Sequence, residues 1–472
     1  MSMRHRATRE RPALVHARPR EGSAAETPAV ASSSLDLETL LASLLGPPSP
    51  SAEPVRIDEA KAEAAPEEAF LAAVVEGALE RMAMLARQRN ERAFCERPRI
   101  EARLLAQMDA IAEAGATAEE IGAFAEADGP KDPWMTWAAA FALGSLAGDA
   151  SMRVLEDLIE GEALDGAEQA LAIAEALVVA PHPGLPVLGR RLLASRSPLS
   201  CVVGLELLSR RGLLESETAS GAALHLSPLV AAAAIRAMAR QDRTALAVAQ
   251  ISPSLRRLER EVAWEAARAL TRWGDREAYL DVREGGPLAS VLGSHGLEIL
   301  VMAGSLDDVE ALTAITRRVP ATAEVLDAVA RFGHPGSGAY LVHWLSEGGL
   351  SRAAARSLET LFGPLVDGAA HTRPAAWREA IVHREPSPGI RHRGGQPWSV
   401  ELVCAEIKSG RLSRQEIERR FDALHARTGV AASVDLALWG PEATASLRAA
   451  ADATQRSPVQ RAAVPVRPSV QR

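Results

Sequence analysis

Apolar positions along the chain follow the spacing of amphipathic helices, and one phrase returns seven or eight times between about Trp134 and Pro364. Each copy has an Ala-rich apolar run, a short break and a second helical run rich in Leu and Val. Successive breaks lie 29 to 34 residues apart, at Gly148-Asp149, His182-Pro183, Gly212, Asp242, Gly274-Asp275, Gly304-Ser305, Gly333-His334-Pro335 and Gly363-Pro364. A fixed period of this size in helical sequence indicates stacked helical hairpins. The pattern therefore predicts an all-α chain built around an α-solenoid of about 7–8 repeats.

The repeat is clearest between Val262 and Asp275, where an Ala-rich helix ends at Gly274. Alanines at helix contacts let neighbouring repeats approach closely, while larger residues fill the space between layers. Glycine accepts the left-handed conformation that ends a helix, and Asp275 is a good cap for the next one. Each break is thus expected to join the two helices of one hairpin.

The repeats resemble HEAT-like repeats of the armadillo-like helical class, particularly the short kind found in bilin lyases, over about half the chain. The chain also resembles a bacterial HEAT-repeat family with myxobacterial members. The matching residues are Glu67 to Leu71, Ile100 to Gly115, and Gly395 to Ser399 leading to Arg427-Thr428-Gly429. Some members are encoded near type VI secretion genes. This resemblance implies a scaffold or accessory role in such a system.

Helical spacing also appears on both sides of the array. Residues 61–130 are expected to form a helical N-terminal cap of about three helices, the last opened by a Thr117/Glu120 capping box. After the array at 131–364 we expect a linker at 365–396, a small helical module at 397–440 and a flexible tail at 441–472. Within the module, Ser399 would cap a helix over 399–409, and Ser413 with Glu416 would open one over 413–427.

Residues 1–60 are rich in Pro, Ser and Ala and basic at their start, which is typical of a disordered tail. Inside lies a predicted short amphipathic helix at 35–45, with leucines at three- and four-residue spacing. Its candidate partner-docking residues are Leu37, Leu40, Leu41 and Leu44. Docking onto the chain's own array and docking in a groove of another protein both remain open.

Charge is unevenly distributed along the chain. The net charge is -8, but residues 1–20 carry six Arg and one Glu and residues 456–472 carry four Arg and no acid, so these ends total +9 and the rest -17. An acidic body is a poor surface for nucleic acid, which needs clustered cations, and suits basic partners better. The three cysteines, Cys95, Cys201 and Cys404, are too far apart in sequence for a disulfide framework or zinc site, which favours a cytoplasmic location. No apolar run approaches 18 residues, so no membrane span is expected.

Common catalytic motifs are missing from the sequence, including GxSxG, HExxH and the phosphate-binding loop. The histidines of the expected linker, His371, His383 and His392, are interpreted as solvated loop residues rather than metal ligands. His182 and His334 precede prolines at breaks, where turn capping is the favoured role.

Clustered carboxylates and the tryptophans of the array are both expected to have structural rather than catalytic roles. Carboxylates at Glu156 to Asp165 and at Asp307 to Glu310 are interpreted as solvated helix ends. The tryptophans of the array are expected mostly in its core, and one exposed on the concave face would be a candidate interaction hot spot.

These patterns predict a non-enzymatic protein–protein interaction scaffold or adaptor that uses the groove of the solenoid, with no cofactor and an unidentified protein partner. A bilin-lyase-like enzyme or chaperone is the first alternative, and it requires a deep pocket with convergent His, Asp or Arg. A nucleic-acid-binding HEAT-like protein is the second alternative, and it requires a cationic groove.

Overall fold

The computed structural model describes residues 65–126, 132–161, 164, 166–241, 243–384, 387, 389–430 and 434–456. The chain divides into two compact units, Met1–Glu63 and Ala64–Arg472, and the description below concerns the second. This unit is mostly helical, as predicted, with one two-stranded antiparallel sheet among the described residues. The predicted helix at 35–45, with Leu37, Leu40, Leu41 and Leu44, lies outside the described residues. No described helix is long and apolar enough to cross a membrane.

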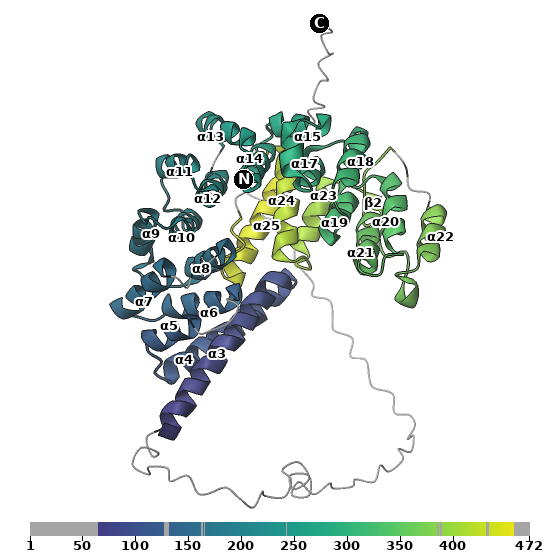
Figure 1. Cartoon of the computed structure of the whole chain (residues 1–472). Helices are drawn as coiled ribbons and strands as arrows, with labels where there is room; N and C mark the ends of the chain where they lie inside the picture. Colours follow the sequence, from purple (N-terminus) through teal and green to yellow (C-terminus); the bar gives the residue numbers. More distant parts are fainter. Residues whose placement is uncertain are drawn as a thin grey trace, which may run out of the picture. The chain divides into compact units, whose positions relative to one another are not determined.

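The helices form two rows that follow an arc (Figure 1). In the inner row each helix packs on the next in chain order: α3 (Ala65–Glu91), α6 (Pro133–Leu143), α8 (Ala167–Val179), α10 (Pro198–Arg210), α12 (Pro228–Ala239), α14 (Arg260–Arg272), α17 (His295–Ala303), α19 (Ala323–Phe332) and α21 (Ser351–Phe362). The outer row contains α5 (Ala118–Glu126), α7 (Asp149–Glu160), α9 (Leu185–Leu193), α11 (Ser216–Ala223), α13 (Ala245–Ile251), α15 (Glu277–Glu284), α18 (Val309–Arg318), α20 (Gly338–Trp344) and α22 (Pro374–Arg384). Helix α4 (Arg97–Glu113) pairs with α3, and the short α16 (Pro287–Leu292) lies between α15 and α17. Five 3-10 turns complete this part: η1 (Phe94–Glu96), η2 (Ser252–Arg256), η3 (Leu306–Asp308), η4 (Pro335–Ser337) and η5 (Gly368–Ala370).

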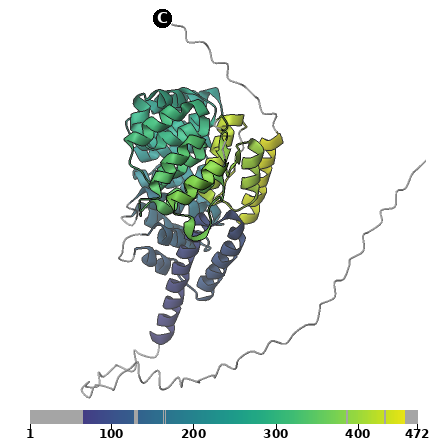
Figure 2. The same ribbon diagram turned by 90° about the vertical axis from the view of Figure 1, so that its right-hand side faces the viewer.

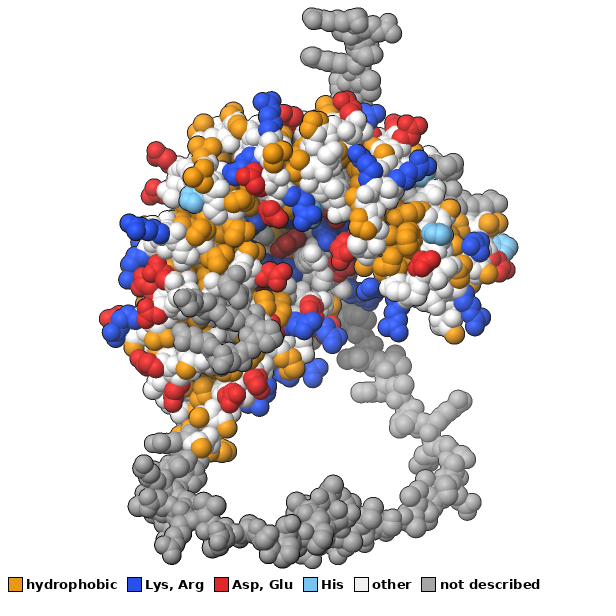
Figure 3. Space-filling model, in the orientation of Figure 1, with side chains coloured by type: hydrophobic (Ala, Val, Ile, Leu, Met, Phe, Trp, Pro, Cys, Tyr) orange, Lys and Arg blue, Asp and Glu red, His pale blue; other side chains and the backbone are white. Residues whose placement is uncertain are grey.

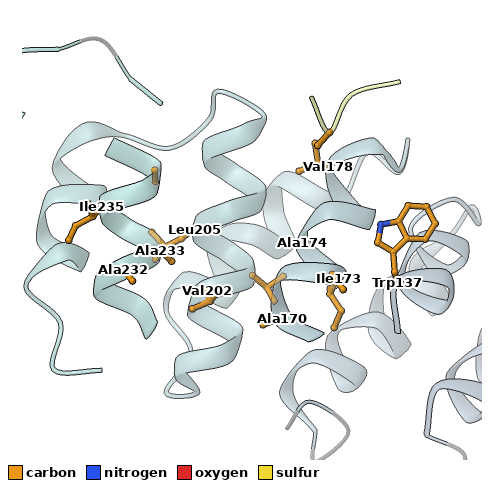
Figure 4. Packing of buried hydrophobic residues seen from close by; sticks show 14 of the residues in the cluster. Trp137, Ala170, Ile173, Ala174, Val178, Val202, Leu205, Ala232, Ala233 and Ile235 are labelled. Carbon is orange, nitrogen blue, oxygen red and sulfur yellow. The ribbon is translucent and has the colours of Figure 1, made fainter. Parts of the chain in front are cut away.

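One continuous hydrophobic cluster fills the space between the rows. Alanines such as Ala170 and Ala233 are fully buried where inner helices meet, and larger residues such as Ile173 and Leu205 fill the gaps beside them (Figure 4). Removing this apolar surface from water is the main stabilising contribution, at about 25 cal/mol per Å². The Ala-rich runs of the sequence are thus the contact surfaces between successive inner helices.

The breaks behave largely as the sequence predicted. Gly148, Gly212, Gly274, Gly333 and Gly363 all have positive φ, whereas Gly304 has φ -68° and ends α17 in an extended conformation, contrary to expectation. Asp275 lies one residue before Arg276, the N-cap of α15, and accepts a hydrogen bond from the backbone N–H of Glu277 at 2.8 Å, so it stabilises the start of α15 from just outside the cap position. Thr117 and Glu120 also form the predicted capping box, at 2.8 and 3.2 Å.

The segment predicted as a linker at 365–396 contains regular structure: η5, α22 and β1 (His392–Arg393), which pairs with β2 (Gln396–Pro397). It returns across the end of the array, where the His392 N–H donates to the Gly333 carbonyl at 2.8 Å. A Cβ on Gly333 would lie 2.7 Å from the His392 carbonyl oxygen, so this break must be glycine for a second reason. The Pro and Gly residues that suggested a linker instead mark the ends of short packed elements, anchored by the fully buried Trp377.

The C-terminal module contains α23 (Val400–Lys408), α24 (Arg414–Thr428) and α25 (Gly440–Arg456). Ser399 caps α23, and Ser413 forms a capping box with Glu416 at the start of α24, as the sequence predicted. The flexible tail predicted from residue 441 is wrong as far as residue 456, because Leu447 and Ala451 of α25 are buried against α23. The three helices, together with Phe94 of η1, enclose a second hydrophobic cluster beside that of the array.

This module lies in the hollow of the arc rather than beyond its end (Figures 1 and 2). Helix α24 contacts the inner helices α3, α14 and α17, and α25 contacts α4. The concave side of the array is therefore partly covered by the chain's own C-terminal helices.

Candidate functional site in the hollow of the array

Charged side chains link neighbouring inner helices along the face that points into the hollow. Arg236 of α12 donates to Glu206 of α10 at 2.9 Å and to Glu265 of α14 at 3.2 Å. Arg331 of α19 donates to Glu298 of α17 at 2.9 Å. Ion pairs thus join α10 to α12, α12 to α14, and α17 to α19 on the inner face, and this set is called the ladder below.

Glu206 is the centre of this ladder. Its side chain is 1% exposed and accepts ion pairs from three guanidinium groups, those of Arg210 (3.2 Å), Arg236 (2.9 Å) and Arg240 (2.7 Å). Burial alone would raise the pKa of Glu206, but attraction to Arg240, Arg236 and Arg210 outweighs it and lowers the pKa well below its usual range. Glu206 is therefore a buried, ionised carboxylate that balances three partly buried cations.

Helix α24 completes the ladder from the other side of the hollow. Asp422 pairs with Arg268 of α14 at 2.7 Å and lies 3.8 Å from Arg272. The Arg272 Nε–H donates to Nδ1 of His425 at 2.8 Å, which requires that nitrogen to be unprotonated. Burial and the neighbouring Arg272 lower the pKa of His425 to about 3, so the imidazole is neutral at physiological pH.

The arginines of α24 contact the array in turn. Arg414 reaches Glu175 of α8 at 2.6 Å, and Arg419 reaches Asp327 of α19 at 3.2 Å. Arg427 donates to the Val301 carbonyl at the end of α17 at 3.0 Å. Cations near a helix C-terminus compensate its partial negative charge. Helix α24 is thus bound along its length by groups of both signs.

A second set of contacts fastens the segment between α24 and α25. Arg89 of α3 donates to the Ala437 carbonyl at 2.7 Å and to the Leu438 carbonyl at 2.8 Å, while pairing with Glu101 at 2.8 Å. Arg97 donates to the Leu436 carbonyl and is fully buried. Burial, followed by repulsion from Arg89 and Arg414, lowers the pKa of Arg97 to about 9.

Trp439 ends this segment against the array. Its indole Nε1–H donates to the Val179 carbonyl at 3.3 Å, and its ring packs edge-on against Phe141 with centroids 5.7 Å apart. The N–H of Gly440 donates to Glu101 at 2.6 Å. The module is therefore anchored to the first repeats as well as to the middle of the array.

A cavity of about 950 Å³ remains between the inner face and the module. Arginines line it together with carboxylates of both walls, and the space-filling view shows basic and acidic side chains gathered in a central hollow (Figure 3). Its charged lining residues are Arg210, Arg236, Arg240, Arg268, Arg272, Arg414, Glu91, Glu175, Glu206, Glu265, Glu418, Asp422 and Asp435. This volume matches that of a small-molecule site, but its walls are more polar than is usual for one.

The hollow continues past this cavity towards the end of the array. Two adjoining cavities of about 430 and 600 Å³ lie beside α17 to α21, and Gln415 and Arg419 of α24 line both. Trp264, half-buried, stacks on His295 at 4.7 Å in the smaller one. Trp264 thus lines the hollow but is half-buried rather than exposed, so it meets only part of the condition set for a hot-spot candidate on the concave face.

The histidines singled out in the sequence do not converge. His182 and His334 accept hydrogen bonds at Nδ1 from the N–H of Gly184 (3.0 Å) and Gly336 (3.1 Å), so His182 closes a turn and His334 caps η4, within the turn or capping role predicted for them. His371 pairs with Glu359 at 3.1 Å. His383 is exposed on α22, while His392 is buried in β1 rather than solvated. Nowhere in the described ranges do three His, Cys, Asp or Glu side chains gather as a metal site.

The carboxylates singled out in the sequence differ from one another. Glu156 pairs with Arg191 at 2.9 Å near the surface, and Asp157 is exposed, as expected of a solvated helix end. Asp308 is instead 1% exposed and accepts from the Tyr279 hydroxyl at 2.9 Å, so its assignment to a solvated face was wrong. The partner of Asp308 is Tyr279, which lies in the preceding helical hairpin. The sequence around Asp308 alone gives no sign of this contact.

The ladder residues were missed for a related reason. Arg236 and Arg268, and four residues later Arg240 and Arg272, repeat at a spacing of 32. A recurring charge in the middle of an Ala-rich helix marks a face that is neither core nor ordinary surface. That signal is present in the sequence and would have indicated an ionic inner face.

Comparison with known proteins adds no family to this picture: no family model, curated protein or solved structure matches the chain.

Proposed function

We propose that the array is a HEAT-like α-solenoid and that the protein is a non-enzymatic protein–protein interaction scaffold or adaptor that binds through its hollow. The observation that carries this proposal is that the hollow already holds a polypeptide helix. Helix α24 is bound there by Arg268, Glu175 and Asp327 of three different repeats. A surface that binds one helix through charged side chains is suited to binding another segment in the same way.

The part of the hollow beside α19 and α21 is the proposed entry point. Glu324 and Arg356 line the 600 Å³ cavity and are exposed, and Glu324 lies within electrostatic reach of Arg419 on α24. Trp264 lies in the adjoining cavity and offers an aromatic anchor of the type that dominates interface energetics. A partner segment with alternating charges and one aromatic or aliphatic anchor would fit this surface.

Affinity capture from native lysate tests the proposal. The full chain is compared with a chain lacking residues 1–60 and with the double variant Glu324→Arg/Arg356→Glu. The matched control is Arg190→Glu, a charge reversal on the outer helix α9. A partner lost with the double variant and kept with the control assigns binding to the hollow, and one lost on truncation assigns it to residues 1–60. Recovery of no specific protein by the full chain would contradict the scaffold proposal.

The resemblance to a HEAT-repeat family with members encoded near type VI secretion genes supports a narrower proposal, an accessory protein of such a system in the bacterial cytoplasm. The same capture experiment tests it, because the recovered partner should then be a component of the secretion apparatus. A partner from an unrelated assembly would be consistent with the scaffold role but would contradict the assignment to a type VI secretion system.

A bilin-lyase-like enzyme or chaperone is a second candidate, favoured by the 950 Å³ cavity in which Arg and Asp side chains converge. Propionate groups of a tetrapyrrole would pair with arginines such as Arg240 and Arg272. Adding a tetrapyrrole to the protein should then shift its absorbance spectrum, and Arg240→Gln/Arg272→Gln should abolish the shift. Nucleic-acid binding has less support, because Arg236 and Arg268 already pair with carboxylates that a phosphate would have to displace.

A further inference from the structure

Three leucines stand out on one edge of the array, well away from the hollow. Leu224, Leu226 and Leu258 are 77%, 93% and 85% exposed. They lie in the two loops that lead into α12 and α14, and none of them lines a cavity described above. Single exposed leucines are ordinary, but a group of three on adjacent loops is an unpartnered apolar surface.

One hydrogen bond joins these two loops, and further polar contacts fold each loop on itself. Arg257 Nη1 donates to the His225 carbonyl at 3.4 Å. Leu226 follows His225 and Leu258 follows Arg257, so each of these leucines is next to a residue of this bonded pair. The Ser227 N–H donates to His225 Nδ1 at 2.9 Å, and Arg257 pairs with Glu259 at 2.9 Å. The leucines therefore project from loops with internal hydrogen bonds, which lowers the conformational entropy that these loops would lose on binding a partner.

The edge is basic although the body of the protein is acidic. Three arginines, Arg256, Arg257 and Arg260, occur in the loop and first turn beside Leu258, against the two carboxylates Glu259 and Glu261. This leaves a local charge of +1, whereas residues 21–455 total -17. Opposite charge on a partner would steer it to this edge and away from the rest of the surface.

We propose that this edge, defined by Leu224, Leu226 and Leu258 with its arginine rim, binds an acidic amphipathic helix of a partner protein that presents leucines at three- and four-residue spacing. The leucines of such a helix would pack on those of the edge, and its carboxylates would face Arg256 and Arg260. Apolar anchors surrounded by charged groups that exclude water are the usual arrangement at an interface. This site is separate from the hollow, so the proposal stands or falls independently of the function proposed above.

A peptide of residues 32–46, fluorescently labelled, provides a probe of this chemistry, because it carries six leucines, Asp36 and Glu38. The receptor is the full chain with Leu37, Leu40, Leu41 and Leu44 changed to Ser, so that its own copy of the sequence does not compete. We expect saturable binding that weakens at least about tenfold in Leu226→Ser/Leu258→Ser. Binding should be unchanged in Leu246→Ser, a leucine that is 67% exposed in the first turn of α13, at the other end of the hairpin.

Charge is tested separately with a second peptide in which Asp36 and Glu38 are replaced by Asn and Gln. Its binding should be several-fold weaker at low salt, and the difference should shrink as salt is raised. The absence of saturable binding, or equal loss in the edge and Leu246 variants, would overturn the proposal. Markedly weaker peptide binding by the unaltered chain than by the four-serine chain would assign the edge to the chain's own segment instead of a partner.

Discussion

At the scale of single residues, Glu206 is the centre of the ladder, because its one carboxylate forms ion pairs with Arg210, Arg236 and Arg240. Glu206→Gln keeps the shape of the side chain but leaves three partly buried cations around a neutral, buried amide. Removing one partner of a buried ion pair costs about 3–5 kcal/mol. We therefore expect the free energy of unfolding to fall by about 3 kcal/mol in urea titrations. Glu217→Gln, on the exposed face of α11, should change it by less than about 0.5 kcal/mol.

The same substitution has a defined pH dependence. The folded-state pKa of Glu206 is lowered, so its stabilising effect is complete above the pKa of the unfolded chain, about 4, and is lost as the pH falls below that value. The stability difference between the native chain and Glu206→Gln should accordingly be constant from pH 8 to pH 5. Below about pH 4 it should shrink. A difference that grew on acidification would contradict the assignment of Glu206 as the ionised centre of the ladder.

His425 provides an independent test at a milder pH. Its folded pKa is lowered to about 3, so between that value and its ordinary pKa of about 6.5 the unfolded chain binds a proton that the folded chain does not. Stability should therefore fall as the pH drops below 6.5, by about 2 kcal/mol at pH 5. His425→Asn retains an acceptor for Arg272 but does not titrate. The pH dependence between 7.5 and 5, measured by urea unfolding, should be flatter by that amount in the variant.

At the scale of elements, helix α24 depends on Asp422 for its contact with α14. Asp422→Arg would place a third guanidinium beside Arg268 and Arg272, and repulsion should displace α24 from the array. Hydrogen exchange should then accelerate at least tenfold in α24 and little in α10, whose helix lies in the separate core of the array. Glu284→Arg, an exposed reversal in the last turn of α15, should leave both unchanged. Equal acceleration throughout the array would instead mean that the two parts unfold together.

Helix ends and repeat breaks were predictable because their chemistry is local: Ser413 with Glu416, and Asp275 with Glu277, are within three residues of each other. The docking of α24 was not predictable, because Asp422 and Arg268 are 154 residues apart and no sequence feature near either residue indicates that they pair. The expected linker failed for the same reason, because the buried Trp377 and the close approach of residue 392 to Gly333 are tertiary features. Sequence periodicity therefore describes each helix and its neighbour, while the occupant of the hollow depends on pairings across the whole array.

At the scale of the whole unit, α24 meets the inner helices mainly through ion pairs and arginine-to-carbonyl bonds, whereas the segment after it also packs Ala437 and Trp439 on the core of the array. Apolar burial thus stabilises the array and the module, while charge, together with these apolar contacts, fixes their relative position. Such a polar interface resembles those between domains that can move apart. The hollow is consequently the part of the molecule whose stability should be most sensitive to salt and to charge substitutions.

A chain ending at residue 396 tests this division directly. The array retains its continuous core and should keep its helical circular dichroism, but the cavity-lining wall formed by α10, α12 and α14 would then hold five arginines and only two glutamates, Glu206 and Glu265, a local charge of +3. Repulsion among these cations, with the loss of the module's contacts, should lower the melting temperature on the order of 5 °C. Because salt screens repulsion, raising NaCl from 0.05 to 0.5 M should recover part of that loss, whereas the full chain should show little change.

A chain ending at residue 456 is the matched control, since it loses only the basic tail and should melt at the same temperature as the full chain. If the chain ending at residue 396 fails to fold at any salt concentration, the array cannot fold without the module. The two hydrophobic cores are then not independently stable.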